Sequence, residues 1–150
     1  MIDFNFKKWN TITGWIVFAI SLAVYGLTIE PTVSFWDAGE YILTSSKLQV
    51  GHPPGAPLFQ MLGAFFSMFA LEASQIGMML NMMSAVASAF TILFMFWTIT
   101  MLLTKLAVVS NTGHEGIDDS NMFLSKNQYI AMLGSGIVGS LAFTFTDSFW

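Results

Sequence analysis

Four side chains that could do chemistry lie close together between two apolar segments: Asp37, Glu40, Lys47 and His52. Asp37 and Glu40 are three residues apart, so on a helix they share one face. A pair of carboxylates can accept a proton, hold a divalent cation or bind a hydroxylated substrate. His52 could donate to a phosphate or move a proton. Lys47 could reach a lipid phosphate or lay its stem along an apolar surface.

Each of these side chains also has a purely structural explanation. Asp37 would complete a helix cap and Glu40 would be a solvated surface acid. His52 would be a loop histidine bonded to a backbone carbonyl, and Lys47 a snorkelling surface lysine. The residues alone leave both explanations open.

The four side chains belong to a long polar stretch, residues 30–58, that also contains every proline of the chain. A connection of this length between two membrane helices is either functional or disordered, and its aromatic and aliphatic residues favour a folded loop. The sequence predicts a helix over 35–48 with Ser34 as N-cap and Asp37 as the third helical residue. The following His-Pro-Pro-Gly, residues 52–55, predicts a rigid turn.

Composition indicates a membrane protein. Of the 150 residues, 55% are hydrophobic and 9% are charged, and the mean hydropathy is +0.66, whereas soluble domains carry about 25% charged residues. A soluble fold of this length could not enclose so much apolar surface. The chain has no cysteine, which excludes disulfides and thiolate metal sites. It has no arginine and no basic patch, which argues against a nucleic-acid partner.

The hydropathy pattern predicts an all-α integral membrane domain with about four transmembrane helices. The predicted spans cover residues 11–29, 57–72, 77–104 and 129–146. The helix within the loop 30–56 would lie along the membrane interface. The chain ends without a natural stop, so we expect it to be the N-terminal part of a larger protein.

Lysines set the expected orientation. Lys7 and Lys8 precede the first span and place it with its start in the cytoplasm. The loop 30–56 then faces the extracytoplasmic side. Four crossings would put residues 105–128 on that side too, although a lysine at each end of this segment runs mildly against the positive-inside rule. In the last span, Ser135/Gly139 and Gly136/Ser140 have the small-xxx-small spacing that favours helix packing.

Two motifs in the loop carry a family resemblance. The sequence reads PTVSFWDAGEY at 31–41 and GHPPGAPL at 51–58. An acidic motif followed by His-Pro-Pro before the second span resembles the GT-C superfamily of polyprenyl-phosphate-dependent glycosyltransferases. The closer likeness is to a family of large membrane proteins, once known only as a domain of unknown function and since linked to protein O-mannosyl transfer. The ending TDSFW at 146–150 is similar to that family as well.

The resemblance implies a GT-C-like fold and the transfer of a sugar from a polyprenyl phosphate to a protein serine or threonine, with inversion. It implies that Asp37 or Glu40 is the general base and that His52 and Lys47 bind the donor phosphate. No cofactor is certain, and a divalent metal is compatible with the acids. The implied partners are the donor lipid, an acceptor protein, the bilayer and other subunits of a membrane complex. The implied location is a bacterial inner membrane, with the loop 30–56 facing the periplasm.

Other functions fit the residues too. The mannosyltransferases have adjacent acids, whereas Ala38 and Gly39 separate Asp37 from Glu40 here, so the sequence does not identify the base. A non-enzymatic membrane subunit whose loop docks a partner is the alternative. A transporter is disfavoured because the spans contain almost no ionisable residue.

Overall fold

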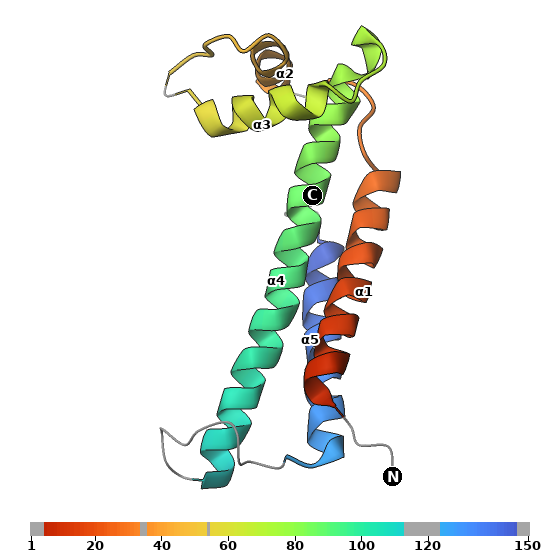
Figure 1. Cartoon of the computed structure of the whole chain (residues 1–150), viewed down its shortest axis with the longest axis vertical. Helices are drawn as coiled ribbons and strands as arrows, with labels where there is room; N and C mark the ends of the chain where they lie inside the picture. The colour runs from red at the N-terminus through yellow and green to blue at the C-terminus, as the bar shows by residue number, and fades with distance from the viewer. Residues whose placement is uncertain (1–4, 34–35, 54, 113–123, 147–150) are drawn as a thin grey trace. The chain divides into compact units, whose positions relative to one another are not determined.

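The computed structural model describes residues 5–33, 36–53, 55–112 and 124–146 (Figure 1). These residues form helices and no strand, which confirms the expected all-α fold class. In chain order the helices are α1 (Phe6–Leu27), α2 (Ala38–Ser46), α3 (Pro57–Ser67), the 3-10 helix η1 (Ala73–Gln75), α4 (Ile76–Thr112) and α5 (Lys126–Thr144).

Among the described residues, two helical segments are long and apolar enough to cross a membrane: Phe6–Leu27 and Ala73–Ser110. They contain most of the predicted first span and all of the predicted span 77–104. The helix at the last predicted span, α5, has 19 residues and is not among these two. The number of spans therefore stays a prediction.

The chain divides into two compact units, one of Met1–Ser21 with Ala89–Trp150 and one of Leu22–Ser88. In the first unit, α1 packs on both α4 and α5. Phe6 stacks on Tyr129 at a ring-centroid distance of 4.6 Å, and Ser21 Oγ lies 3.0 Å from Thr144 Oγ1 in a buried hydrogen bond. Since both residue numbers rise together, α1 and α5 run parallel.

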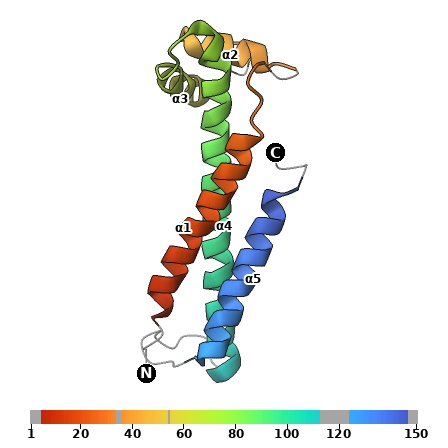
Figure 2. The same ribbon diagram turned by 90° about the vertical axis from the view of Figure 1, so that its right-hand side faces the viewer.

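Within this unit, α4 runs antiparallel to α1. Trp97 Nε1 donates to the Asn10 backbone oxygen over 3.4 Å. Two turns further along α1, the ring centroid of Phe18 lies 4.7 Å from that of Phe90, which is two turns earlier in α4. Figure 2 shows α1, α4 and α5 side by side over this part of the chain.

The small residues of α5 let α4 approach closely, as their spacing predicts. A Cβ added to Gly136 would come within 2.8 Å of Phe96 and 2.9 Å of Thr100. A Cβ added to Gly139 would come within 2.9 Å of Ile99. Real Cβ atoms do not approach so closely, so a side chain at 136 would displace Phe96 and Thr100, whereas at 139 only the tip of the Ile99 side chain would have to move.

This register brings four of the five lysines to one end of the first unit. Lys7 and Lys8 lie at the start of α1, Lys105 lies near the end of α4, and Lys126 begins α5. We expected residues 105–128 on the side opposite to Lys7 and Lys8. In the structure, Lys105 and Lys126 instead lie at the same end of this unit as Lys7 and Lys8, because α4 is antiparallel to α1 and α5 is parallel to it. The side of the membrane on which this end lies stays a prediction.

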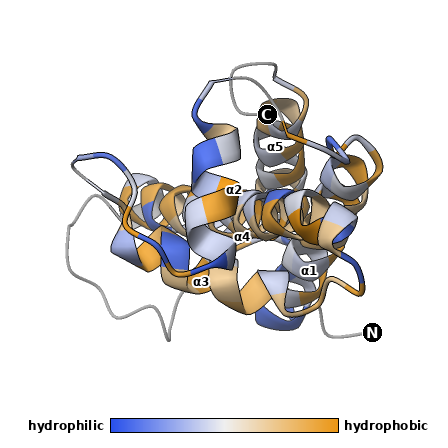
Figure 3. Cartoon of the chain, turned by 90° about the horizontal axis from the view of Figure 1, so that it is seen from above, coloured by the Kyte–Doolittle hydropathy of each residue, from blue (hydrophilic) through white to orange (hydrophobic). Residues whose placement is uncertain are grey.

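The second unit contains α2, α3 and the first turns of α4. Gly63 of α3 sits against α2, where an added Cβ would lie 2.8 Å from Ser45 Cβ, and against α4, where it would lie 3.3 Å from Leu80 Cδ2. Figure 1 shows α3 running across the first turns of α4. In Figure 3, α3 is coloured mainly as apolar, in keeping with its sequence PLFQMLGAFFS.

The predicted span at 57–72 contains only the short helix α3. Its 11 residues make about 17 Å of helix, whereas the hydrocarbon core of a bilayer is about 30 Å thick. The helix is therefore too short to cross by itself. Hydropathy could not reveal this, because Met68, Phe69 and Leu71 extend the apolar run after the helix has ended at Ser67.

Candidate active site

The site is built on α2, which begins later than its sequence predicts. The helix covers 38–46 instead of 35–48, and Asp37 occupies the N-cap position without a side-chain capping hydrogen bond. The expectation that Asp37 is the third helical residue is therefore wrong, and the predicted N-cap, Ser34, lies outside the described residues. The Asp37 backbone oxygen accepts from Tyr41 N at 3.0 Å, and its side chain is exposed. An acid at this end of a helix has a favourable interaction with the helix dipole.

Glu40, in the first turn of α2, binds His52 through both carboxylate oxygens. His52 N donates to Glu40 Oε1 over 2.8 Å, and His52 Nδ1 lies 2.8 Å from Glu40 Oε2. The side chains are 39% and 49% exposed for Glu40 and His52, so this pair faces solvent at the edge of the loop. The structure thus joins two of the four predicted site residues, although they are 12 positions apart in sequence.

The contact changes the ionisation of both partners. The hydrogen bond from the His52 backbone, followed by that from its imidazole, lowers the pKa of Glu40. The hydrogen bond to Glu40 and its negative charge raise the pKa of His52, and Asp37 adds a smaller effect in the same direction. Both shifts favour a carboxylate facing an imidazolium.

Local sequence explains how His52 reaches Glu40. Gly55 N donates to the His52 oxygen at 2.9 Å, which closes the turn predicted from His-Pro-Pro-Gly. Gly55 has a φ of 72°, a conformation that glycine adopts without strain. Gly51 lies so close to the pair that an added Cβ would be 3.3 Å from both Glu40 Oε1 and Gln60 Nε2. The glycine lets the backbone of the loop approach the carboxylate.

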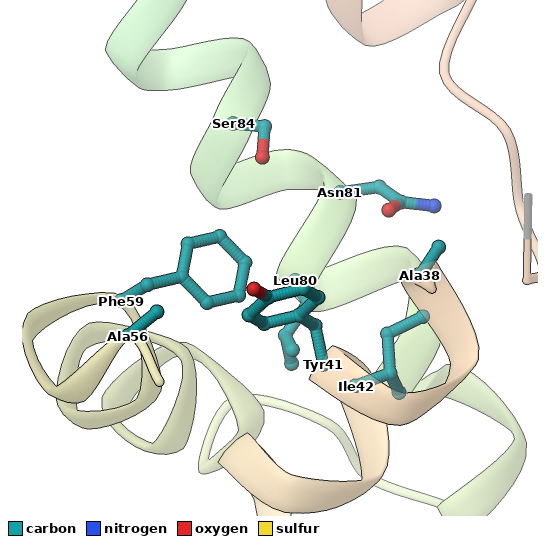
Figure 4. A pocket seen from close by; sticks show the side chains of 8 residues that line it. All are labelled: Ala38, Tyr41, Ile42, Ala56, Phe59, Leu80, Asn81 and Ser84. Carbon is teal, nitrogen blue, oxygen red and sulfur yellow. The ribbon is translucent and has the colours of Figure 1, made fainter. Parts of the chain in front are cut away.

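A cavity of about 430 Å³ adjoins the pair. Tyr41 lies between the pair and the cavity. Its ring is edge-on to that of His52, with a centroid distance of 6.3 Å, and edge-on to that of Phe59, with a centroid distance of 5.4 Å. Figure 4 shows Tyr41 from α2 and Phe59 from α3 facing the start of α4, which contributes Leu80, Asn81 and Ser84 to the lining. The cavity wall is mainly apolar, with three polar side chains.

Lys47 lies elsewhere. It is the exposed C-cap residue of α2, and its backbone N–H bonds the Leu43 oxygen. It lines a separate hollow of about 320 Å³ with Val33, Leu43 and Ser74 among others. No contact in the described part of the chain joins Lys47 to His52, so its role in binding the donor stays a prediction.

Sequence reasoning missed three residues of the site. Tyr41 and Gln60 carry no charge to mark them. Asn81 Nδ2 donates to the backbone oxygens of Glu30 at 2.8 Å and Thr32 at 3.0 Å. It therefore fixes the start of the loop to α4. A lone amide in an apolar helix was the available signal.

The described residues contain no group of three or more His, Cys, Asp or Glu that could hold a metal ion. His114, the acids that follow it and Asp147 lie outside the described residues. Within the described chain, the candidate site residues gathered at one place are Glu40, His52 and Tyr41, with Asp37 beside them.

Comparison with known sequences identifies the family. Residues 37–150 match the family model described as "Protein O-mannosyl-transferase TMEM260 N-terminal domain". The chain belongs to this family. The match begins at Asp37 and includes Glu40 and His52, so the family segment contains the whole pair.

Two relatives of this TMEM260 family bear the same name. The protein O-mannosyl-transferase tmem260 of Dictyostelium discoideum is 38% identical over 93 residues, which cover 58% of this chain and 11% of the relative. The protein O-mannosyl-transferase TMEM260 of Mus musculus is 34% identical over 76 residues, 49% of this chain and 11% of the relative. The chain thus matches about a tenth of the length of these relatives. No solved structure matches it.

Proposed function

We propose that the protein containing this chain transfers a sugar from a polyprenyl phosphate to a serine or threonine hydroxyl of an acceptor protein. The name of its relatives makes mannose the sugar to test first. The observation that carries the proposal is the family match over the segment that holds Asp37, Glu40 and His52. The implied GT-C fold and the donor lipid are part of the proposal.

The chemistry needs a base and a group that meets phosphate charge. In a single displacement, the acceptor oxygen attacks the anomeric carbon, the bond from that carbon to the phosphate oxygen breaks, and the configuration inverts. The hydroxyl proton passes to a carboxylate, a step worth about 100- to 10,000-fold. The leaving polyprenyl phosphate gains negative charge, which a positioned donor stabilises. Asp37 is exposed and makes no side-chain capping bond, which supports its role as the base. His52 is partly exposed, which supports its role as the hydrogen-bond donor to the phosphate.

The lysines support an orientation for this reaction. Lys7, Lys8, Lys105 and Lys126 share one end of the first unit, which the positive-inside rule assigns to the cytoplasm. With α1 and α4 crossing the membrane in opposite directions, residues 28–75 would leave and re-enter it on the side away from these lysines. The site would then face the extracytoplasmic space, where the acceptor hydroxyl arrives from water.

The test is transfer from polyprenyl-phosphate mannose to a peptide containing serine and threonine, with the full-length protein in detergent or liposomes. Asp37→Asn removes the charge and keeps the shape, and we expect it to lower turnover about 100-fold or more. Folding should be unaffected, because Asp37 makes no side-chain capping bond.

The matched control is Glu72→Gln, the same loss of charge at an exposed acid whose carboxylate contacts Ser74. It should keep full turnover. If the wild-type protein transfers no sugar, or if Asp37→Asn is as active as Glu72→Gln and wild type, the proposed function of this loop is wrong.

A further inference from the structure

Glu40 and Asp37 lie at the same end of α2, but their carboxylates differ in hydrogen bonding. Both oxygens of Glu40 accept hydrogen bonds from His52, one from the backbone and one from the ring. Asp37 makes no side-chain capping bond and is exposed. An ionised carboxylate that already holds two donors is a weak base toward a third group, since its charge is stabilised by the bonds.

The same contact fixes the imidazole of His52. An ionised carboxylate only accepts, so Nδ1 carries the proton that faces Glu40 Oε2. Tyr41 lies edge-on to the ring, the Gly55 bond closes the turn behind it, and Gly51 leaves room for the backbone to approach. The free nitrogen, Nε2, is left for a ligand.

We propose that Glu40 is a positioning residue that acts through His52, holding the imidazole protonated and oriented so that Nε2–H donates to the phosphate of the donor, while Asp37 is the base. The inference rests on the proposed function and divides the two acids, which the sequence leaves equivalent. A protonated ring is required because a neutral ring with its proton on Nδ1 would offer Nε2 only as an acceptor.

The charges around His52 support this state. Glu40 and Asp37 both raise its pKa, and the described elements that contact the ring, α2 and the loop 47–56, bring no cation against it. Tyr41, the other titratable group at the ring, contributes its edge. The site thus combines a fixed positive donor with a separate free carboxylate.

The test is a double-mutant cycle in the full-length protein, with polyprenyl-phosphate mannose as the varied substrate. Glu40→Gln and His52→Ala should each raise the KM for the donor roughly ten- to a hundredfold, the value of one charge-assisted hydrogen bond, and leave kcat much less affected. Because Glu40 acts through His52, the double variant should be no worse than His52→Ala alone. Asp37→Asn should show the opposite split, with kcat lowered and the KM for the donor kept.

Three kinetic results would overturn the inference. If the single effects multiply in the double variant, Glu40 acts independently of His52. If Glu40→Gln lowers kcat at saturating donor as much as Asp37→Asn does, Glu40 is a base. A fall in kcat without a change in donor KM for His52→Ala would likewise make the Glu40–His52 pair the proton acceptor.

A second measurement does not depend on activity. In protein labelled with 15N-histidine, the His52 ring is the signal lost in His52→Ala, and its titration reports its pKa and tautomer. Glu40→Gln should bring that pKa down toward the ordinary value, whereas an unchanged titration would overturn the inference. If the wild-type protein transfers no sugar, the proposed function fails while this measurement still tests the contact.

Discussion

The contact between α2 and α3 gives a prediction whose magnitude follows from the structure. An added Cβ at Gly63 would lie 2.8 Å from Ser45 Cβ and 2.9 Å from Ser45 Oγ. Carbon atoms pack best at about 3.5–4.0 Å, so Gly63→Ala would drive the two helices about 1 Å apart or strain them. Ser45 is fully buried and cannot turn into solvent.

Two opposing terms set the net effect of Gly63→Ala. Overpacking costs about 1–3 kcal/mol, and alanine in a helix interior returns about 1 kcal/mol. We therefore expect a loss of up to about 2 kcal/mol in the free energy of unfolding. The displacement would also move α3 relative to α2, which carries Glu40, so the donor KM should rise as it does in Glu40→Gln.

Gly134→Ala is the matched control, because no described atom lies within 4 Å of a Cβ at Gly134. Only the gain in helix propensity applies to this variant, so its free energy of unfolding should be unchanged or higher. The measurement is unfolding of the detergent-solubilised protein by denaturant, and the two variants should differ by about 1–3 kcal/mol. Adding Ser45→Gly to Gly63→Ala should recover most of the loss, since it restores the missing space. If Gly63→Ala is as stable as Gly134→Ala, the close contact of α2 and α3 is wrong.

Two further predictions concern pH and the membrane. The pKa of His52 is raised, so its contribution to folding stability is complete below the ordinary value of 6.5 and is lost as the pH rises through the raised pKa. The pKa of Glu40 is lowered, so its contribution to folding stability is complete above the ordinary value of 4.5 and is lost as the pH falls through the lowered pKa. Donor binding measured against pH should therefore fall at both ends, and Glu40→Gln should move the alkaline limit to lower pH. If that limit stays in place, the pair does not control binding.

For the membrane, single cysteines at Gln49, Ser74 and Ser110, all exposed, can be labelled with an impermeant thiol reagent in sealed membranes. We expect 49 and 74 on one side and 110 on the other; labelling of 49 and 74 from opposite sides would restore a crossing at 57–72.

How much of the site could be read from the sequence depends on the range of the interactions. The His-Pro-Pro-Gly turn and the helix that follows Asp37 were predicted, because proline, glycine and capping residues act over three or four positions. The capping box predicted at the start of this helix is wrong. Asp37 sits at the N-cap position, three positions before the predicted one, because the helix begins at Ala38 and not at residue 35.

The sequence by itself determined that this protein is helical and apolar, that its polar chemistry lies in one loop, and which family it resembles. Those properties follow from composition, from apolar runs and from short motifs. The tertiary structure decided that Glu40 binds His52, that α3 lies across α4, and that Lys105 and Lys126 share an end with Lys7 and Lys8. Each of these depends on contacts between residues far apart in the chain, which a local sequence pattern does not reveal. Hydropathy, in particular, is the same for a helix that crosses the membrane and for one that lies on another helix.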